Sequence, residues 1–263
     1  MTGLQIFGYG AGAVLIFMTL IWIGSLVRKD ASIVDSFWGL GFVMLAVIYF
    51  ALGGGFPPRK LLLTILVAIW GLRLAIHIFA RNAGKGEDKR YRAWRVQNPQ
   101  DFWWISYFRV FLLQGVLMLI ISAPLLAAQI GPQPEALTVL DWAGLALWLV
   151  GFSFEAIGDW QLVRFKADPA NAGSVLNTGL WAYTRHPNYF GEAVLWWGYF
   201  LIAAGAGGYW SIFSPVLMTF LLVRVSGVAL LERTLTRERK GYTEYIARTS
   251  AFIPWFPKKS GSA

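Results

Sequence analysis

The chain has 263 residues, of which 57% are hydrophobic and 14% are charged, and its formal net charge is +9. The apolar fraction exceeds the roughly 45–50% of soluble domains, and in an apolar chain basic loops orient helices, so we expect a membrane protein that does not bind nucleic acid. The chain has no cysteine and two histidines, which excludes disulfides and thiolate metal sites and argues against any metal site.

Seven apolar segments are each long enough to cross a bilayer, which takes about 20 residues. The first has no basic n-region before it and no small-residue cleavage site after it, so we interpret it as a transmembrane helix rather than a cleaved signal peptide. The segments predict an all-α polytopic membrane protein forming one domain over residues 1–263. The predicted spans are 4–27, 33–53, 61–81, 103–130, 138–163, 187–206 and 208–231, followed by a cytoplasmic tail, 232–263.

Basic residues are distributed unequally between the two faces that seven spans define. The 81–95 and 164–185 connections and the C-terminal tail share one face with Arg28 and Lys29, and they hold most of the Lys and Arg residues. The opposite face carries Arg59 and Lys60. The positive-inside rule therefore predicts a cytoplasmic C-terminus and an external N-terminus.

The second and third spans carry polar residues that need an explanation. Asp35 lies near the start of the second span, where it either pairs with Arg73 or faces a substrate cavity. Arg73, His77 and Arg81 follow at steps of four, which predicts one polar stripe on a helix. The stripe leads into the 84–91 loop, which either forms part of a site or is a solvated, self-paired segment.

The fifth span ends in a second polar cluster. Glu155 and Asp159 are four residues apart and share a helix face, and Arg164 and Lys166 follow them. Carboxylates inside a membrane segment are costly and usually functional. They either bind the hydroxyl and amide groups of a nucleotide or form a structural ion pair with the two basic residues.

The sixth span begins with the most distinctive motif, Tyr-Thr-Arg-His-Pro-Asn-Tyr-Phe-Gly-Glu at residues 183–192. Pro187 suits the first position of a helix, and Arg185 and His186 beside that helix end predict a phosphate site. Asn188 and Glu192 share a face. The alternative is an interfacial anchor on a capped helix.

The segment after the last span is basic and aromatic. Glu232 and Thr236 are helical neighbours, as are Arg233 and Arg237, and Tyr242 and Tyr245 follow. Such a run either binds anionic lipid or contributes stacking faces to a site. The apolar 251–255 segment is expected to pack against the bundle. Because these clusters share one membrane face, and no Rossmann fingerprint or P-loop is present, we expect loops and helix ends to form one pocket for a phosphorylated dinucleotide.

The 179–192 motif resembles the C-terminal signature of the steroid 5α-reductase family, which sterol reductases and isoprenylcysteine carboxyl methyltransferases share more loosely. Trp-Gly-Leu-Arg-Leu at 70–74, Gly-Glu-Asp-Lys-Arg-Tyr at 86–91 and Ser-Ile-Val-Asp-Ser-Phe-Trp-Gly at 32–39 resemble a bacterial branch of that group. The resemblance covers nearly the whole chain. It implies a seven-helix enzyme of the bacterial inner membrane whose cofactor site faces the cytoplasm.

The resemblance also implies NADPH-dependent reduction of the C=C bond of a 3-oxo-4-ene steroid or similar lipophilic enone, by a monomer without a protein partner. Asp35 takes the place of a family Glu that grips the substrate carbonyl, while Ile78 stands where the family has a Tyr, with His77 adjacent. The implied cofactor residues are Arg81, Asn82, Glu87, Arg90, Tyr91, Glu155, Asp159, Arg164, Lys166, Asn177, Leu180, Tyr183, Arg185, His186, Asn188, Tyr189, Glu192, Glu232, Arg233, Arg237, Tyr242 and Tyr245.

A reductase of this kind transfers a hydride to the β-carbon of the enone while an acid stabilises the developing enolate. A protonated Asp35, aided by Arg73 or His77, is the predicted acid. One alternative is an S-adenosylmethionine-dependent methyltransferase that holds a different nucleotide in the same loops. Another alternative is a transporter. Two observations argue against it: the polar residues cluster at one face of the membrane, and no inverted repeat is visible.

Overall fold

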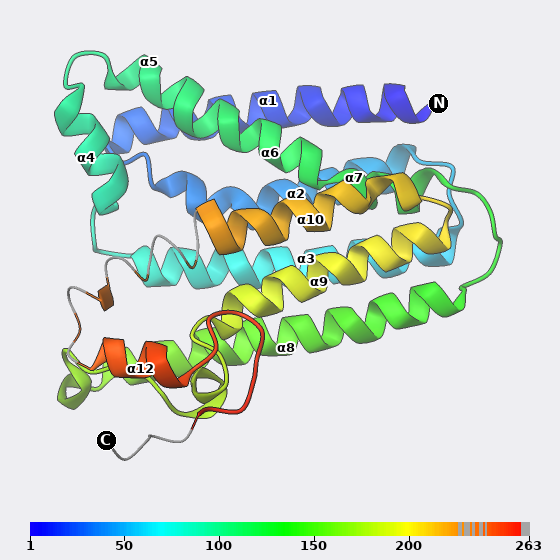
Figure 1. Ribbon diagram of the computed structural model, residues 1–263. Helices are drawn as coiled ribbons and strands as arrows, with labels where there is room; N and C mark the ends of the chain where they lie inside the picture. Colours follow the sequence, from blue (N-terminus) through cyan, green and yellow to red (C-terminus); the bar gives the residue numbers. More distant parts are fainter. Residues whose placement is uncertain (226–227, 229–231, 233–234, 237–238, 240, 259–263) are drawn as a thin grey trace. The chain divides into compact units, whose positions relative to one another are not determined.

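The computed structural model describes residues 1–258 except 226–227, 229–231, 233–234, 237–238 and 240 (Figure 1). The described residues contain helices and no β-strand. In chain order these are α1 (Gly3–Arg28), α2 (Ile33–Leu52), α3 (Pro57–Asn82), α4 (Lys89–Gln97), α5 (Phe102–Ser106), η1 (Tyr107–Leu112), α6 (Leu113–Ile121), α7 (Ala123–Ile130), α8 (Val139–Ala167), η2 (Pro169–Asn171), η3 (Gly179–Ala182), α9 (Pro187–Gly205), η4 (Tyr209–Ile212), α10 (Phe213–Phe220), η5 (Leu221–Val225) and α12 (Tyr242–Arg248).

The protein is an all-helical polytopic membrane protein. Among the described residues, five helices are long and apolar enough to cross a bilayer: Gly3–Arg28, Ile33–Leu52, Pro57–Asn82, Phe102–Ile130 and Val139–Ala167. They coincide with the first five predicted segments to within a few residues. The predicted sixth segment corresponds to α9, and the seventh to a shorter apolar helix, Tyr209–Val225, whose predicted continuation to 231 falls mainly outside the described residues.

Local sequence explains where these helices begin and break. Thr2 and Gln5 form a reciprocal capping box at the start of α1, and α3 and α9 each begin at a proline, which needs no backbone donor there. The predicted 103–130 helix is interrupted at Ser122, because Pro124 has no N–H and a new helix starts around it. It also contains a π-helical turn, η1.

The chain divides into two units: Met1–Asp141 with Ile202–Ser211, here called unit 1, and Trp142–Leu201 with Ile212–Ala263, called unit 2. In unit 1, α2 packs against α1 and α3. Gly39 and Gly71 let the backbones of α2 and α3 meet, because a Cβ on Gly71 would lie 2.6 Å from the Gly39 carbonyl oxygen. The rings of Phe42 and Trp70 fill the core beside this contact, 5.7 Å apart.

A buried ion pair closes one end of unit 1. Arg59 on α3 donates from Nε to Asp141 Oδ1 at 2.7 Å and from Nη2 to Oδ2 at 3.0 Å, and both side chains are 0% exposed. The Ala136 carbonyl accepts a further bond from Arg59, and Thr138 donates to Asp141 from its amide and hydroxyl. The pair therefore ties the 134–141 connection to α3.

In unit 2, α8 and α9 approach closely at glycines. A Cβ on Gly151 would lie 2.5 Å from the Leu195 nitrogen, and one on Gly198 would lie 2.7 Å from the Gly144 carbonyl oxygen. Small residues at such crossings let membrane helices pack at short range. This contact fixes the polar ends of α8 and α9 beside each other.

Candidate functional site

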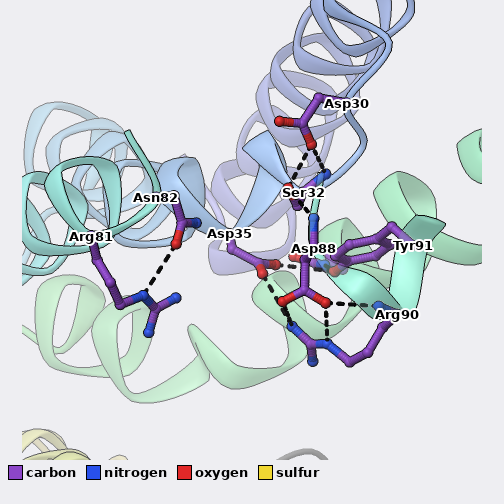
Figure 2. A network of polar contacts seen from close by, with 9 residues as sticks. Asp30, Ser32, Asp35, Arg81, Asn82, Asp88, Arg90 and Tyr91 are labelled. Carbon is purple, nitrogen blue, oxygen red and sulfur yellow. Dashed lines mark hydrogen bonds and ion pairs between the residues drawn. The ribbon is translucent and has the colours of Figure 1, made fainter. Parts of the chain in front are cut away.

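A polar cluster in unit 1 joins α2 to α4. Tyr91 donates its hydroxyl hydrogen to Asp35 Oδ1 at 3.1 Å, and Arg90 Nη2 lies 3.4 Å from Asp35 Oδ2 (Figure 2). Gln114 Nε2 donates to the Tyr91 oxygen at 3.3 Å. Asp35 is thus held by a neutral donor and a cation, and we call these four residues the Asp35 cluster.

The electrostatics of the cluster favour a protonated tyrosine. Burial, together with the negative charge of Asp35, raises the pKa of Tyr91 well above its ordinary value. Burial opposes the charge of Arg90, but Asp88 and Asp35 outweigh it and raise the pKa of Arg90. At neutral pH the cluster therefore holds a phenol hydroxyl and a guanidinium within reach of one carboxyl group.

The loop before α4 is fastened to the α1–α2 connection. Glu87 accepts from the Ala31 amide at 2.8 Å and forms a two-bond ion pair with Arg95. Asp88 caps α4 and accepts from Arg90, and its own amide donates to Ser32 at 3.2 Å (Figure 2). These bonds position Arg90 and Tyr91 beside Asp35, so the loop is both self-paired and part of the cluster.

The remaining predicted residues of unit 1 lie on α3. Arg73 and His77 are partly buried one helical turn apart, as the stripe predicts. Asp35 forms a salt bridge with Arg90, a partner that neither sequence alternative, pairing with Arg73 or facing a substrate cavity, had named. The reason is that the 83–88 loop turns α4 back over the start of α2. Exposed Arg81 donates to Asn82, apart from the cluster (Figure 2).

A second cluster lies within unit 2. Asn188 Nδ2, in the first turn of α9, donates to Asp159 Oδ1 of α8 at 3.0 Å, and Asp159 is 6% exposed. The segment before α9 is held nearby: Trp181 Nε1 donates to the Gly158 carbonyl, and Gln161 accepts from the Leu180 amide at 3.1 Å. Asp159 and Asn188, both predicted site residues, are therefore in direct contact within unit 2.

Arg185 and His186 bind the C-terminal segment. Arg185 Nε donates to Glu232 Oε1 at 2.7 Å, and its Nη1 donates to the Ile246 and Thr249 carbonyls. The His186 Nε2 atom lies 3.3 Å from the same Glu232 oxygen. Burial opposes the charge of Glu232, but the bonds to His186 and Arg185 outweigh it and lower its pKa. Arg185 thus clamps the tail through the protein's own groups.

The other predicted residues of unit 2 are distributed around these two contacts. Tyr189 stacks on His186 at 5.6 Å, Tyr242 packs on Tyr245, and the Arg164 guanidinium lies over Trp160. Tyr245 donates to the Trp181 carbonyl. Glu155 of α8 is buried and Glu192 of α9 is partly buried. The exposed residues are Lys166, Asn177 and Tyr183. Arg233 and Arg237 lie outside the described residues.

The tail agrees only in part with its prediction. Within the tail, the Thr236 hydroxyl donates to the Glu232 carbonyl, as the predicted helical spacing requires. Before it in the chain, Pro187 begins α9 as predicted. Phe252 packs against Phe190, whereas Ile253 and Trp255 are 67% and 72% exposed. An alternating segment buries one side of its residues, so only part of 251–255 packs inward.

Sequence reasoning missed Gln114, Ser32 and Gln161. Gln114 is the one polar side chain in the stretch from Val110 to Ile121, and a lone amide in an apolar helix signals a buried partner. Ser32 and Gln161 carry no such signal, because short polar residues at helix ends are common.

The comparisons assign a family. The family described as "Protein of unknown function (DUF1295)" matches residues 21–249, which is most of the chain. The chain belongs to the DUF1295 family. An uncharacterized protein of Schizosaccharomyces pombe is 25% identical to this DUF1295 protein over 270 residues, covering 92% of this chain and 77% of the yeast protein. No solved structure matches this chain.

Proposed function

We propose that this protein reduces the C=C bond of a lipophilic enone with NADPH as reductant. The observation that carries the proposal is the Asp35 cluster, in which a carboxyl group, a phenol and a guanidinium converge at the end of an apolar membrane helix. A carboxylate within a membrane helix, such as Asp35, is costly and usually functional. An apolar bundle suits a greasy substrate such as a 3-oxo-4-ene steroid.

The cluster can bind a substrate carbonyl and stabilise the charge that develops on its oxygen. Tyr91 keeps its proton because its pKa is raised, and the Arg90 guanidinium is permanently charged. As the β-carbon is reduced, negative charge moves to the carbonyl oxygen, where fixed donors lower its free energy. Tyr91 has a single O–H, which it donates to Asp35 in this structure, so it would turn from Asp35 to the substrate carbonyl, whereas Arg90 has further N–H groups to donate while it stays on Asp35. In this proposal Tyr91 and Arg90 replace Arg73 and His77 as the partners of Asp35.

The residues of unit 2 fit a dinucleotide. Asp159 and Asn188 offer a carboxylate and an amide, which suit ribose hydroxyls and a nicotinamide carboxamide. Arg164 and Lys166 are exposed cations at the end of α8 and suit phosphate groups. Arg185 does not fit as a phosphate ligand, because it already binds Glu232 and two carbonyls. Bound NADPH would supply the hydride.

The proposal includes seven spans with a cytoplasmic C-terminus in a bacterial inner membrane, acting as a monomer. Unit 1 supports this orientation. At one end, the charge of the fully buried Arg59 is neutralised by Asp141, and Lys60 donates a hydrogen bond to the Gly53 carbonyl. Lys85, Lys89 and Arg92 at the other end are exposed. The positive-inside rule places exposed positive charge on the cytoplasmic side, so the end with Lys85, Lys89 and Arg92 would face the cytoplasm.

The first test is to identify the nucleotide that copurifies with the full chain by mass spectrometry, followed by fluorescence-quenching titration with NADPH and with S-adenosylmethionine. Binding of NADPH supports the proposal. Binding of S-adenosylmethionine alone replaces it with a methyltransferase, and solute flux in proteoliposomes without any nucleotide replaces it with a transporter.

The second test separates chemistry from binding. Asp35→Ala should abolish NADPH oxidation with a 3-oxo-4-ene steroid in detergent while NADPH affinity stays within about twofold of native. Asp141→Asn, at the opposite end of unit 1, serves as the control for general destabilisation. Undiminished turnover in Asp35→Ala would remove Asp35 from the reaction.

A further inference from the structure

Helix α4 has two distinct faces. Tyr91 and Arg95, four residues apart, point toward the rest of unit 1, where Tyr91 bonds Asp35 and Arg95 bonds Glu87. Lys89, Arg92 and Val96 follow the helical spacing of the other face, and all three are exposed. The helix is therefore anchored on one side and open on the other.

The open face combines positive charge with apolar surface. The side chains of Lys85, Lys89 and Arg92 make no hydrogen bond or salt bridge within the part of the chain that the structure describes. In contrast, Arg90 and Arg95 are paired with acidic groups. Val96, on the same face, is 72% exposed. At the start of the next membrane segment, Trp103 and Trp104 are 55% and 44% exposed.

The position of α4 places this face at a membrane surface. It lies between two helices long enough to cross the bilayer, α3 and Phe102–Ile130. The Ala31 amide donates to Glu87 just before α4, and Trp22 donates to the Trp103 carbonyl just after it, so α4 is held where α1 ends and α2 begins (Figure 1). Tryptophan is enriched at the headgroup level of bilayers. A nine-residue basic helix with apolar side chains suits the same level.

We propose that Lys85 and the open face of α4 form a lipid-binding face for anionic phospholipid headgroups, defined by Lys85, Lys89, Arg92 and Val96. The three cations attract phosphate, while Val96 enters the apolar boundary beneath it. Because Arg90 and Tyr91 lie on the same helix, a bound anionic lipid also stabilises their contacts with Asp35. This inference does not rest on the proposed reductase activity.

The test is binding of fluorescent phosphatidylglycerol and phosphatidylcholine to the purified full chain in neutral detergent micelles. The native chain should prefer phosphatidylglycerol. Each basic residue near an anionic surface contributes about a fivefold change in affinity, so Lys89→Gln/Arg92→Gln should bind phosphatidylglycerol about 30-fold more weakly. Lys89→Arg/Arg92→Lys keeps both charges and should bind as native does.

A matched control uses one exposed lysine and one exposed arginine of unit 2, Arg248→Gln/Lys258→Gln, which should retain native affinity. Glycerol phosphate, the free headgroup analogue, should not displace the lipid. Equal affinity for the two lipids, native affinity in Lys89→Gln/Arg92→Gln, or an equal loss in the control would each overturn the proposal. Displacement by glycerol phosphate would show a site for soluble phosphate instead.

Phosphatidylglycerol should also raise the thermal unfolding midpoint of the native chain, because a ligand that binds only the folded state stabilises it by mass action. The midpoint of Lys89→Gln/Arg92→Gln should not respond. An equal response in both chains would count against α4 as the binding face, whatever the activity of the enzyme.

Discussion

Tyr91 of α4 donates a 3.1 Å hydrogen bond to Asp35 of α2, although the two residues lie 56 positions apart in the chain. The bond exists because Glu87 and Asp88 fasten the intervening loop to Ala31 and Ser32. A phenol with a raised pKa is thereby held against a membrane carboxyl group, and this pairing is where the proposed chemistry can be tested most directly.

Tyr91→Phe should lower turnover of an enone by about 100-fold, because it removes one donor to the developing enolate. Stability should fall by about 1 kcal/mol, the usual net value of one hydrogen bond. NADPH oxidation and thermal unfolding measure the two effects. Tyr209→Phe, an exposed tyrosine remote from the Asp35 cluster, provides the comparison. Native turnover in Tyr91→Phe would show that the reaction does not use the hydroxyl.

The Glu87–Arg95 contact predicts a loss of stability in acid. Burial opposes the charge of Glu87, but bonds from Arg95 and the Ala31 amide outweigh it and hold its pKa below the ordinary 4.5. A lowered carboxyl pKa stabilises the fold above about pH 4.5, and this contribution disappears as the pH falls through the folded-state pKa. The unfolding midpoint of Glu87→Gln should therefore decline less than that of the native chain as the pH falls from about 5.5 to about 3.5, one unit on either side of the ordinary pKa of 4.5.

The Arg59–Asp141 pair should behave as a buried ion pair. Arg59→Met leaves an uncompensated carboxylate and should cost about 3–5 kcal/mol. Arg59→Met/Asp141→Leu removes both charges and should recover part of that loss, although Thr138 loses its acceptor. Denaturant unfolding in detergent measures the free energies. Asp141→Leu alone completes the comparison. If the double variant loses at least as much unfolding free energy as the two single variants together, the loss in Arg59→Met does not come from an unpaired buried charge.

Arg185→Gln should loosen the C-terminal segment. The change removes the Glu232 ion pair and weakens the bonds to Ile246 and Thr249, at a cost of about 2 kcal/mol. Amide hydrogen exchange should accelerate at Trp255, whose N–H bonds the Tyr183 carbonyl. Exchange in α1 serves as the internal reference, and equal acceleration there would indicate global unfolding rather than a local clamp.

Gly39→Ala should destabilise the chain by more than 2 kcal/mol, as overpacking typically costs about 1–3 kcal/mol and here the new methyl meets backbone. Its Cβ would overlap the Gly71 carbonyl. Gly12→Ala is the matched control, because no atom lies within 4 Å of its added Cβ. Alanine there should be neutral or stabilising, since it favours helix. Similar unfolding midpoints for both variants would contradict the close α2–α3 contact.

The sequence by itself determined the membrane character and most helix bounds. The prediction of 33–53 became Ile33–Leu52, and the Pro187 helix start is confirmed. Hydropathy and proline act through the residues themselves and their near neighbours, so they can be read along the chain. The helix-end positions of Asp159 and Asn188 can likewise be read along the chain, whereas the hydrogen bond between them requires the packing of α8 on α9.

Only the tertiary structure decided the partners of the charged groups. Asp35 bonds Arg90 and Tyr91, which the sequence alternatives for Asp35 had not named, and Arg185 bonds the C-terminal segment, although its place beside the start of α9 had suggested a phosphate site. Ion pairs and hydrogen bonds require atoms within about 3–4 Å, and which remote residues come that close depends on how loops turn and helices pack. Spacing along the chain carries no such information.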